Sequence, residues 1–128
     1  MEGVFQEGNQ KVPTISFDPT TGVFEIKGNS IPENAGAIYE PIIELLKKYK
    51  DQPAEKTILN IELSYFNTSS SKWILNILRM LKEMNSETKA KVEINWKYEA
   101  EDDEMLEAAE DYESILRIPI NKIEIQED

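Results

Sequence analysis

The side chains with the most scope for chemistry are a run of hydroxyl groups after an asparagine, Asn67-Thr68-Ser69-Ser70-Ser71. The run separates an apolar, β-branched segment from a segment whose apolar residues recur at helical spacing. Oxygens of Ser, Thr and Asn accept hydrogen bonds from the free N–H groups that begin a helix. A phosphate on such a hydroxyl would add about -1.5 to -2 charge at the positive end of the helix dipole. The pattern predicts a helix cap, and a phosphorylation site stays open as the second interpretation.

A second cluster consists of carboxylates, Glu99-Ala100-Glu101-Asp102-Asp103-Glu104. It lacks the central glycine and the ligand alternation of a calcium loop. Negative side chains are favoured at the start of a helix by its dipole. We therefore expect a solvated helix start without a metal, and an enzyme that uses Asp102 and Asp103 for acid/base work is the weaker alternative.

Several catalytic groups are missing from the composition. The chain has no histidine and no cysteine, which excludes Ser-His-Asp and Cys-His catalysis as well as disulfides and thiolate metal ligands. Its five glycines form neither a dinucleotide fingerprint nor a phosphate loop. We expect a protein that is not an enzyme and that needs no cofactor.

The charge balance limits the partners. The chain has 25 acidic and 14 basic residues, which gives a net charge of -11. Such a field repels nucleic acids and anionic membranes, so we expect neither as a partner. The first residues show no signal-peptide pattern and no segment reaches the ~20 apolar residues of a membrane span, so we expect a cytoplasmic location.

The elements that must position these groups follow from hydrophobic periodicity. In order, we expect strands at 14–17 and 23–27, a helix that ends near Lys50, a strand at 57–63, a helix from 69, a strand at 91–98, a helix from 105 and a strand at 118–125. Pro41 either kinks the first helix or places its start near Glu40. The order ββαβαβαβ predicts a single α/β (α+β) domain at 13–126, with about five strands in a mixed sheet, three helices and a flexible tail at 1–12.

Three aromatic residues are candidates for a contact surface. Trp96 and Tyr98 share one face of a predicted strand, and Trp73 lies early in the second helix. We expect them to pack in or near the core, with a partner-binding patch as the alternative.

Four motifs in a fixed order resemble a known family. They are Gly28-Asn29-Ser30-Ile31-Pro32-Glu33-Asn34, Tyr65-Phe66-Asn67-Thr68-Ser69-Ser70, Trp96-Lys97-Tyr98, and Asp102-Asp103-Glu104-Met105-Leu106-Glu107-Ala108 with Asp111-Tyr112. In these motifs, from about residue 13 to 125, the chain resembles the SiaC family of regulatory phosphoproteins.

The resemblance implies a fold like that of STAS (anti-anti-sigma-factor-like) domains and a role in cyclic-di-GMP signalling and biofilm regulation. It implies that Thr68 is the phosphoacceptor, with Ser69 and Ser70 as alternatives. It also implies a Ser/Thr kinase and a PP2C-type phosphatase that set the phosphorylation state, and a diguanylate cyclase that the unphosphorylated form binds and activates. We expect partner contacts at Pro32, Glu33, Asn34, Asn67, Thr68, Ser69, Ser70 and Trp73. The competing hypothesis is a constitutive adaptor or homo-oligomer in which Thr68 is only a helix cap.

Overall fold

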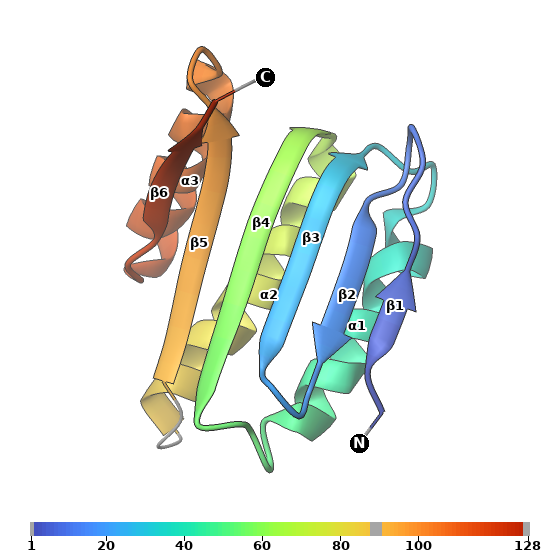
Figure 1. Cartoon of the computed structure of the whole chain (residues 1–128), viewed down its shortest axis with the longest axis vertical. Coiled ribbons are helices and arrows are strands. Elements are labelled where there is room, and N and C mark those ends of the chain that lie inside the picture. The colour runs from blue at the N-terminus through green and yellow to red at the C-terminus, as the bar shows by residue number, and fades with distance from the viewer. Residues whose placement is uncertain (1, 88–90, 127–128) are drawn as a thin grey trace.

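The computed structural model describes residues 2–87 and 91–126, which form one six-stranded sheet and three helices (Figure 1). The elements are β1 (Val4–Gln6), β2 (Thr14–Asp18), β3 (Val23–Ser30), α1 (Ala35–Tyr49), β4 (Lys56–Phe66), α2 (Thr68–Glu87), β5 (Lys91–Glu99), α3 (Asp103–Leu116) and β6 (Asn121–Ile125). The strands lie side by side in chain order, with β1, β2 and β3 antiparallel and β3 to β6 parallel. The predicted mixed α/β sheet with three helices is confirmed, with six strands instead of about five.

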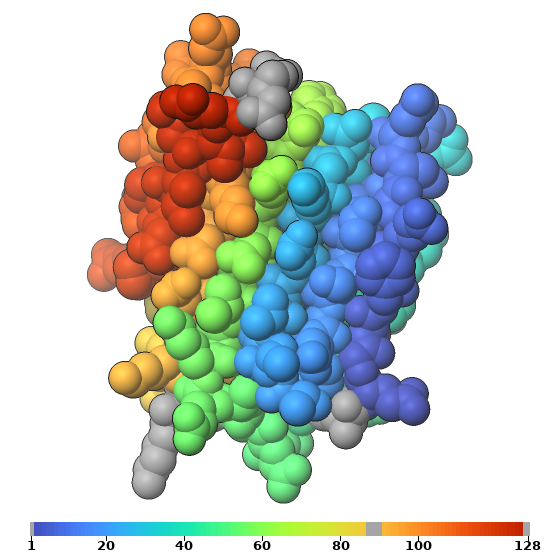
Figure 2. Space-filling view, in the orientation of Figure 1, coloured from blue at the N-terminus to red at the C-terminus, as the bar shows by residue number. Residues whose placement is uncertain are grey.

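All three helices cover the same face of the sheet (Figure 1). Each helix connects two neighbouring parallel strands, and such crossover connections are right-handed. Because β4, β5 and β6 are added in the same direction across the sheet, the three helices lie on the same face. Figure 2 shows the opposite face, where the strands run side by side without a helix over them. Alternation along β3 follows from this, because Phe24 and Ile26 point to the helices and are buried while Glu25 and Lys27 are exposed.

The core lies between the sheet and the helices. In α2 the predicted stripe Ile74, Ile77, Leu78, Leu81 and Met84 is buried throughout. Burying each such side chain contributes roughly 1.5–3 kcal/mol. Within the described residues no helix has both the length and the apolar character needed to cross a bilayer.

The N-terminal segment corrects a prediction. Residues 1–12 were expected to be a loose tail, but β1 lies within them and pairs with β2, with Phe5 opposite Ser16. The following loop is also ordered, because the Asn9 side-chain oxygen accepts hydrogen bonds from the N–H groups of Lys11 and Val12 at 2.8 and 3.0 Å. A strand of three residues is too short to show alternation in the sequence.

The helix α1 settles the question raised by Pro41. It begins at Ala35, and Pro41 lies inside it. The missing N–H of Pro41 leaves the carbonyl of Ala37 without its helical donor. Both residues are exposed, so water can satisfy that carbonyl and the helix continues to Tyr49.

A β-bulge interrupts the pairing of β3 with β4. The register shifts between Gly28 and Asn29, and Gly28 has a φ of 110°, a conformation that side chains with a Cβ rarely adopt. The extra residue on β4 reverses its alternation after Leu63. As a result Tyr65 is 56% exposed, while the ring of Phe66 packs edge-on against Trp96.

An asparagine ladder crosses the uncovered face of the sheet. Asn60, Asn95 and Asn121 are in register on β4, β5 and β6. The Asn95 amide donates to the Asn60 side-chain oxygen at 2.9 Å, and the Asn121 amide donates to that of Asn95 at 3.0 Å. Side-chain hydrogen bonds therefore join the three parallel strands in addition to the backbone ladder.

Candidate functional site

The helix α2 is capped by Asn67. Its side-chain oxygen accepts a hydrogen bond from the N–H of Ser70 at 2.9 Å, and its carbonyl accepts the first helical bond from Ser71 at 3.0 Å. The predicted helix cap in this segment is confirmed, and the capping residue is Asn67. Thr68 is the first helical residue, is exposed, and forms no hydrogen bond through its hydroxyl within the described residues. A role for Thr68 as a cap is therefore not observed.

The serines after Thr68 have different surroundings. Ser69 is exposed, and its hydroxyl donates weakly to the Asn67 side-chain oxygen at 3.4 Å. Ser70 is 0% exposed. Its hydroxyl donates to the backbone carbonyl of Ser30 at 3.0 Å and accepts from the Ser30 hydroxyl at 2.8 Å. Thr68 and Ser69, two of the three candidate phosphoacceptors, are exposed to solvent, whereas the third, Ser70, is buried.

A buried hydroxyl network lies beneath the start of α2. The Ser30 hydroxyl also meets the Tyr39 hydroxyl at 2.5 Å, so the network joins β3, α1 and α2. Burial raises the pKa of Tyr39 to about 12. On the other side of the helix, the Tyr112 hydroxyl of α3 donates to the Ser71 carbonyl at 3.0 Å and lies 2.9 Å from the Ser71 hydroxyl. Burial raises the pKa of Tyr112 as well.

The loop between β3 and α1 is held against the start of α2. The Asn67 amide donates to the Pro32 carbonyl at 3.2 Å, and the Asn67 N–H donates to the Ser30 carbonyl at 2.9 Å. Pro32 is buried, whereas Glu33 and Asn34 are exposed, and the Asn34 side chain caps α1 by accepting from Ala37 N–H at 3.2 Å. The two capped helix starts are therefore neighbours at the carboxyl ends of β3 and β4.

Trp73 completes this surface from the second turn of α2. It is half-buried and packs against the core. A Cβ atom placed on Gly36 would lie 3.3 Å from Cζ2 of Trp73, so the indole approaches the first turn of α1 closely. The structure thus brings seven predicted residues together, and we call this group the switch patch: Pro32, Glu33, Asn34, Asn67, Thr68, Ser69 and Trp73. Pro32 is its buried member, and the other six are exposed or half-buried. The eighth, Ser70, supports the patch from below.

The electrostatics of the switch patch favour a negative group at Thr68. The first turns of α1 and α2 contain no acidic residue. The N–H groups of Thr68 and Ser69 have no acceptor within the described residues. Free N–H groups and the positive end of the helix dipole both stabilise an anion at this position.

The sequence also matches a known protein family. The model of a family described as SiaC family regulatory phosphoprotein matches residues 6–125. The chain belongs to the SiaC family. The resemblance seen in the four sequence motifs is confirmed.

Individual relatives match over most of their length. An uncharacterised protein of Pseudomonas aeruginosa strain UCBPP-PA14 is 28% identical over 112 residues, which are 88% of each chain. The crystal structure of apo-SiaC from Pseudomonas aeruginosa has a TM-score of 0.87 and 26% identity, and the match covers 96% of this chain and 99% of that one. In a crystal structure of the diguanylate cyclase SiaD with its activator SiaC, from the same species, the matching chain has a TM-score of 0.88 and 25% identity, with 95% and 99% covered.

The acidic cluster has a structural role in this SiaC-family chain. Asp102 caps α3, because its side-chain oxygen accepts from Met105 N–H at 3.0 Å. Asp103 and Glu104 follow in the first turn and are exposed. Within residues 2–87 and 91–126, no group of three or more carboxylates could hold a metal ion. Asp102 and Asp103 thus form the start of α3, as the helix-start interpretation predicted.

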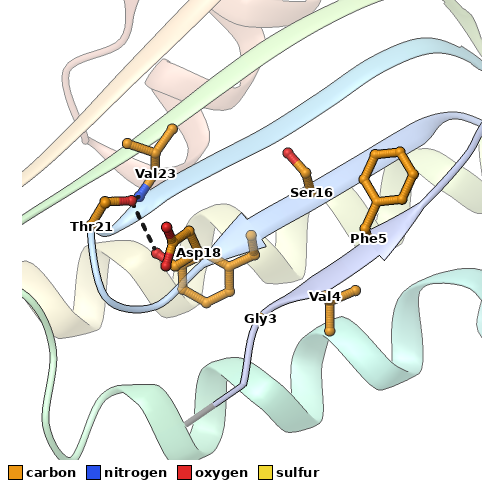
Figure 3. A pocket seen from close by; sticks show the side chains of 8 residues that line it. Gly3, Val4, Phe5, Ser16, Asp18, Thr21 and Val23 are labelled. Carbon is orange, nitrogen blue, oxygen red and sulfur yellow. Dashed lines mark hydrogen bonds between the residues drawn. The ribbon is translucent and has the colours of Figure 1, made fainter.

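A hollow of about 540 Å³ lies beside the turn that joins β2 and β3, and Figure 3 shows side chains that line it. Phe5 of β1, Ser16 and Asp18 of β2 and Val23 of β3 line it, and Phe5 is 71% exposed. No residue of the switch patch lines this hollow.

Sequence reasoning missed the residues that support the site. Ser30, Tyr39 and Tyr112 come from three other elements, and no local pattern links them to residues 70 and 71. Among the aromatic candidates, Trp96 is 0% exposed, and Trp73 and Tyr98 are half-buried and pack against the core, so the packing interpretation is confirmed.

Proposed function

We propose that this chain is a phosphorylation-switched regulatory domain whose phosphoacceptor is Thr68. The observation that supports this most directly is the position of the Thr68 hydroxyl, which is exposed and free at the start of a helix capped by another residue. A kinase can reach this hydroxyl without breaking a hydrogen bond. Ser69 is the alternative acceptor, whereas Ser70 would first have to leave its buried network.

The proposed target is a diguanylate cyclase, bound and activated by the unphosphorylated form. The support is the solved complex of SiaD with its activator SiaC, whose SiaC chain has the same fold as this protein. A reversible phosphate also requires a Ser/Thr kinase and a PP2C-type phosphatase, which we propose as the other two partners. In this proposal the protein is cytoplasmic and meets the cyclase, the kinase and the phosphatase there.

The proposed mechanism is a change of surface charge at a rigid position. A phosphate on Thr68 adds about -1.5 to -2 charge and three acceptor oxygens to the switch patch. Asn67, Ser70 and Ser71 hold the start of α2 to the loop after β3, to β3 itself and to α3. The phosphate therefore alters the contact surface directly, by repulsion and by desolvation cost, while the helix stays in place.

Mass spectrometry and binding measurements test the proposal together. Intact-mass and peptide analysis of the protein from its native host should locate one phosphate on Thr68. Isothermal titration with the cyclase of the same organism should then show binding of the unmodified protein and at least a tenfold loss after stoichiometric phosphorylation.

Matched variants separate the switch from constitutive binding. Thr68→Ala should bind the cyclase and resist phosphorylation, and Ser69→Ala should still be phosphorylated. Full phosphorylation of Thr68→Ala by the cognate kinase would overturn the assignment of Thr68. Equal cyclase affinity of the phosphorylated and unphosphorylated proteins would favour a constitutive adaptor instead.

A further inference from the structure

A groove between α2 and α3 is a second candidate surface on the helical side of the molecule. It has a volume of about 410 Å³ and is lined by Arg79, Lys82, Glu83, Ser86, Ile115 and Leu116. None of these residues belongs to the switch patch. At ~1.5 Å per residue along α2, Arg79 lies roughly 16 Å from Thr68.

The charge of the groove is opposite to that of the whole chain. Among the described residues that line the groove, Arg79 and Lys82 contribute two cations and Glu83 contributes one carboxylate, in a protein with a net charge of -11. Arg79 donates to the neutral side-chain oxygen of Asn76 at 3.2 Å. Within the described residues neither cation has an ion-pair partner. Both charges are thus available to a partner.

The groove also presents apolar surface. Ile115 is 63% exposed, although it is a large aliphatic residue in the last turn of α3. Leu116 beside it is buried and forms part of the apolar lining. The methylene stems of Arg79 and Lys82 can extend the apolar strip while their charged ends stay in water.

We propose that this groove docks an acidic amphipathic helix of a protein partner. An amphipathic helix places an apolar face into a groove of this kind, and carboxylates on its flanks would meet Arg79 and Lys82. The charge complementarity selects an acidic partner segment, because elsewhere the net charge of -11 repels acidic chains. Nucleic acid and anionic lipid extend well beyond two cations and would meet that repulsion. This second contact is independent of the phosphate on Thr68.

Two synthetic peptides of 16 residues provide the probes. Both have leucines on one helical face, and the polar positions hold glutamate in one peptide and lysine in the other. Titration of the ¹⁵N-labelled full chain should show that the glutamate peptide shifts the amide signals of residues 79–86 and 115–116. The affinity should fall at higher salt, because the attraction is electrostatic.

Three variants define the contacts. Arg79→Glu/Lys82→Glu should weaken binding of the glutamate peptide at least tenfold, and Ile115→Ser should weaken it severalfold. Lys11→Glu/Lys48→Glu is the matched control, since it reverses two exposed lysines of elements that do not line the groove and should leave the affinity within about twofold. Thermal melting verifies that each variant is folded.

Three results would overturn the proposal. One is a glutamate peptide that leaves the groove signals unchanged, and another is an unchanged affinity in Arg79→Glu/Lys82→Glu. The third is a lysine peptide that binds the groove as well as the glutamate peptide does. None of these results bears on the phosphorylation of Thr68.

Discussion

Replacing Asn67 should destabilise the protein far more than replacing its neighbour Thr68. The Asn67 side chain accepts from Ser70 N–H at 2.9 Å and donates to the Pro32 carbonyl at 3.2 Å. Loss of an N-cap costs about 1 kcal/mol, and loss of a partly buried hydrogen bond about 1 kcal/mol more. Asn67→Ala should therefore lower the free energy of unfolding by about 2 kcal/mol.

The same estimate gives the expected shift in melting temperature. An unfolding entropy of ~2.1 cal/mol/K per residue amounts to about 0.27 kcal/mol/K for this chain, so a 2 kcal/mol loss corresponds to about 7 °C. Thr68→Ala removes an exposed hydroxyl without a hydrogen-bond partner, and its effect should stay within about 0.5 kcal/mol. Asn67→Asp keeps the capping oxygen and loses the donor to Pro32, so it should fall between the two.

Urea unfolding followed by tryptophan fluorescence measures these differences, because Trp96 is buried in the folded protein. Circular dichroism melts give the second readout. If Thr68→Ala lost as much stability as Asn67→Ala, Thr68 would be a structural cap and the assignment of the cap to Asn67 would be refuted. A small effect makes Thr68→Ala a clean probe of phosphorylation.

Three further predictions follow from buried or paired groups. Ser70→Ala should cost about 1–3 kcal/mol in urea unfolding, since it removes the acceptor of the Ser30 hydroxyl and a donor to the Ser30 carbonyl; an effect under about 0.5 kcal/mol would contradict the network. Burial raises the pKa of Tyr39 from 10.0 to about 12, so its contribution to the stability of the fold is present below pH 10 and is lost as the pH rises through 12. Thermal melts at increasing pH should therefore show that Tyr39→Phe is less sensitive to alkaline pH than the unmodified protein. Hydrogen bonds from Lys122 and from the backbone N–H of Ile120 lower the pKa of Glu113. Its contribution to the stability of the fold is therefore present above pH 4.5 and is lost at lower pH. Glu113→Gln should therefore destabilise at pH 7 and not at pH 3, and equal losses at both would contradict this.

Periodicity predicted the elements that bury a regular face. The stripe from Ile74 to Met84 and the alternation of β3 are strong because each side chain on the buried face is apolar. The start of α2 was placed correctly within one residue for the same reason. β1 was missed, since its order depends on pairing with β2 and not on its own composition.

The details of the site depended on tertiary contacts. The sequence could not show which residue of the polar run is the cap, because Asn, Thr and Ser all suit that position. Ser70 did leave a signal: it precedes Ile74 by one helical turn and so shares the buried face of α2. The exposure of Tyr65 results from the bulge at Gly28, which has no signature in the periodicity of β4.

The asparagine ladder on the uncovered face sets the register of the three parallel strands that it joins. Those strands are separated by whole helices, so no tight turn can set their alignment as it does in a hairpin. A slip of β5 by one residue would carry Asn95 to the helical side and leave its amide buried without partners, which costs several kcal/mol in an apolar setting. The amides thereby fix how far β4 extends past β5. They also fix how far Asn67 and Thr68, which follow β4, lie beyond the end of β5.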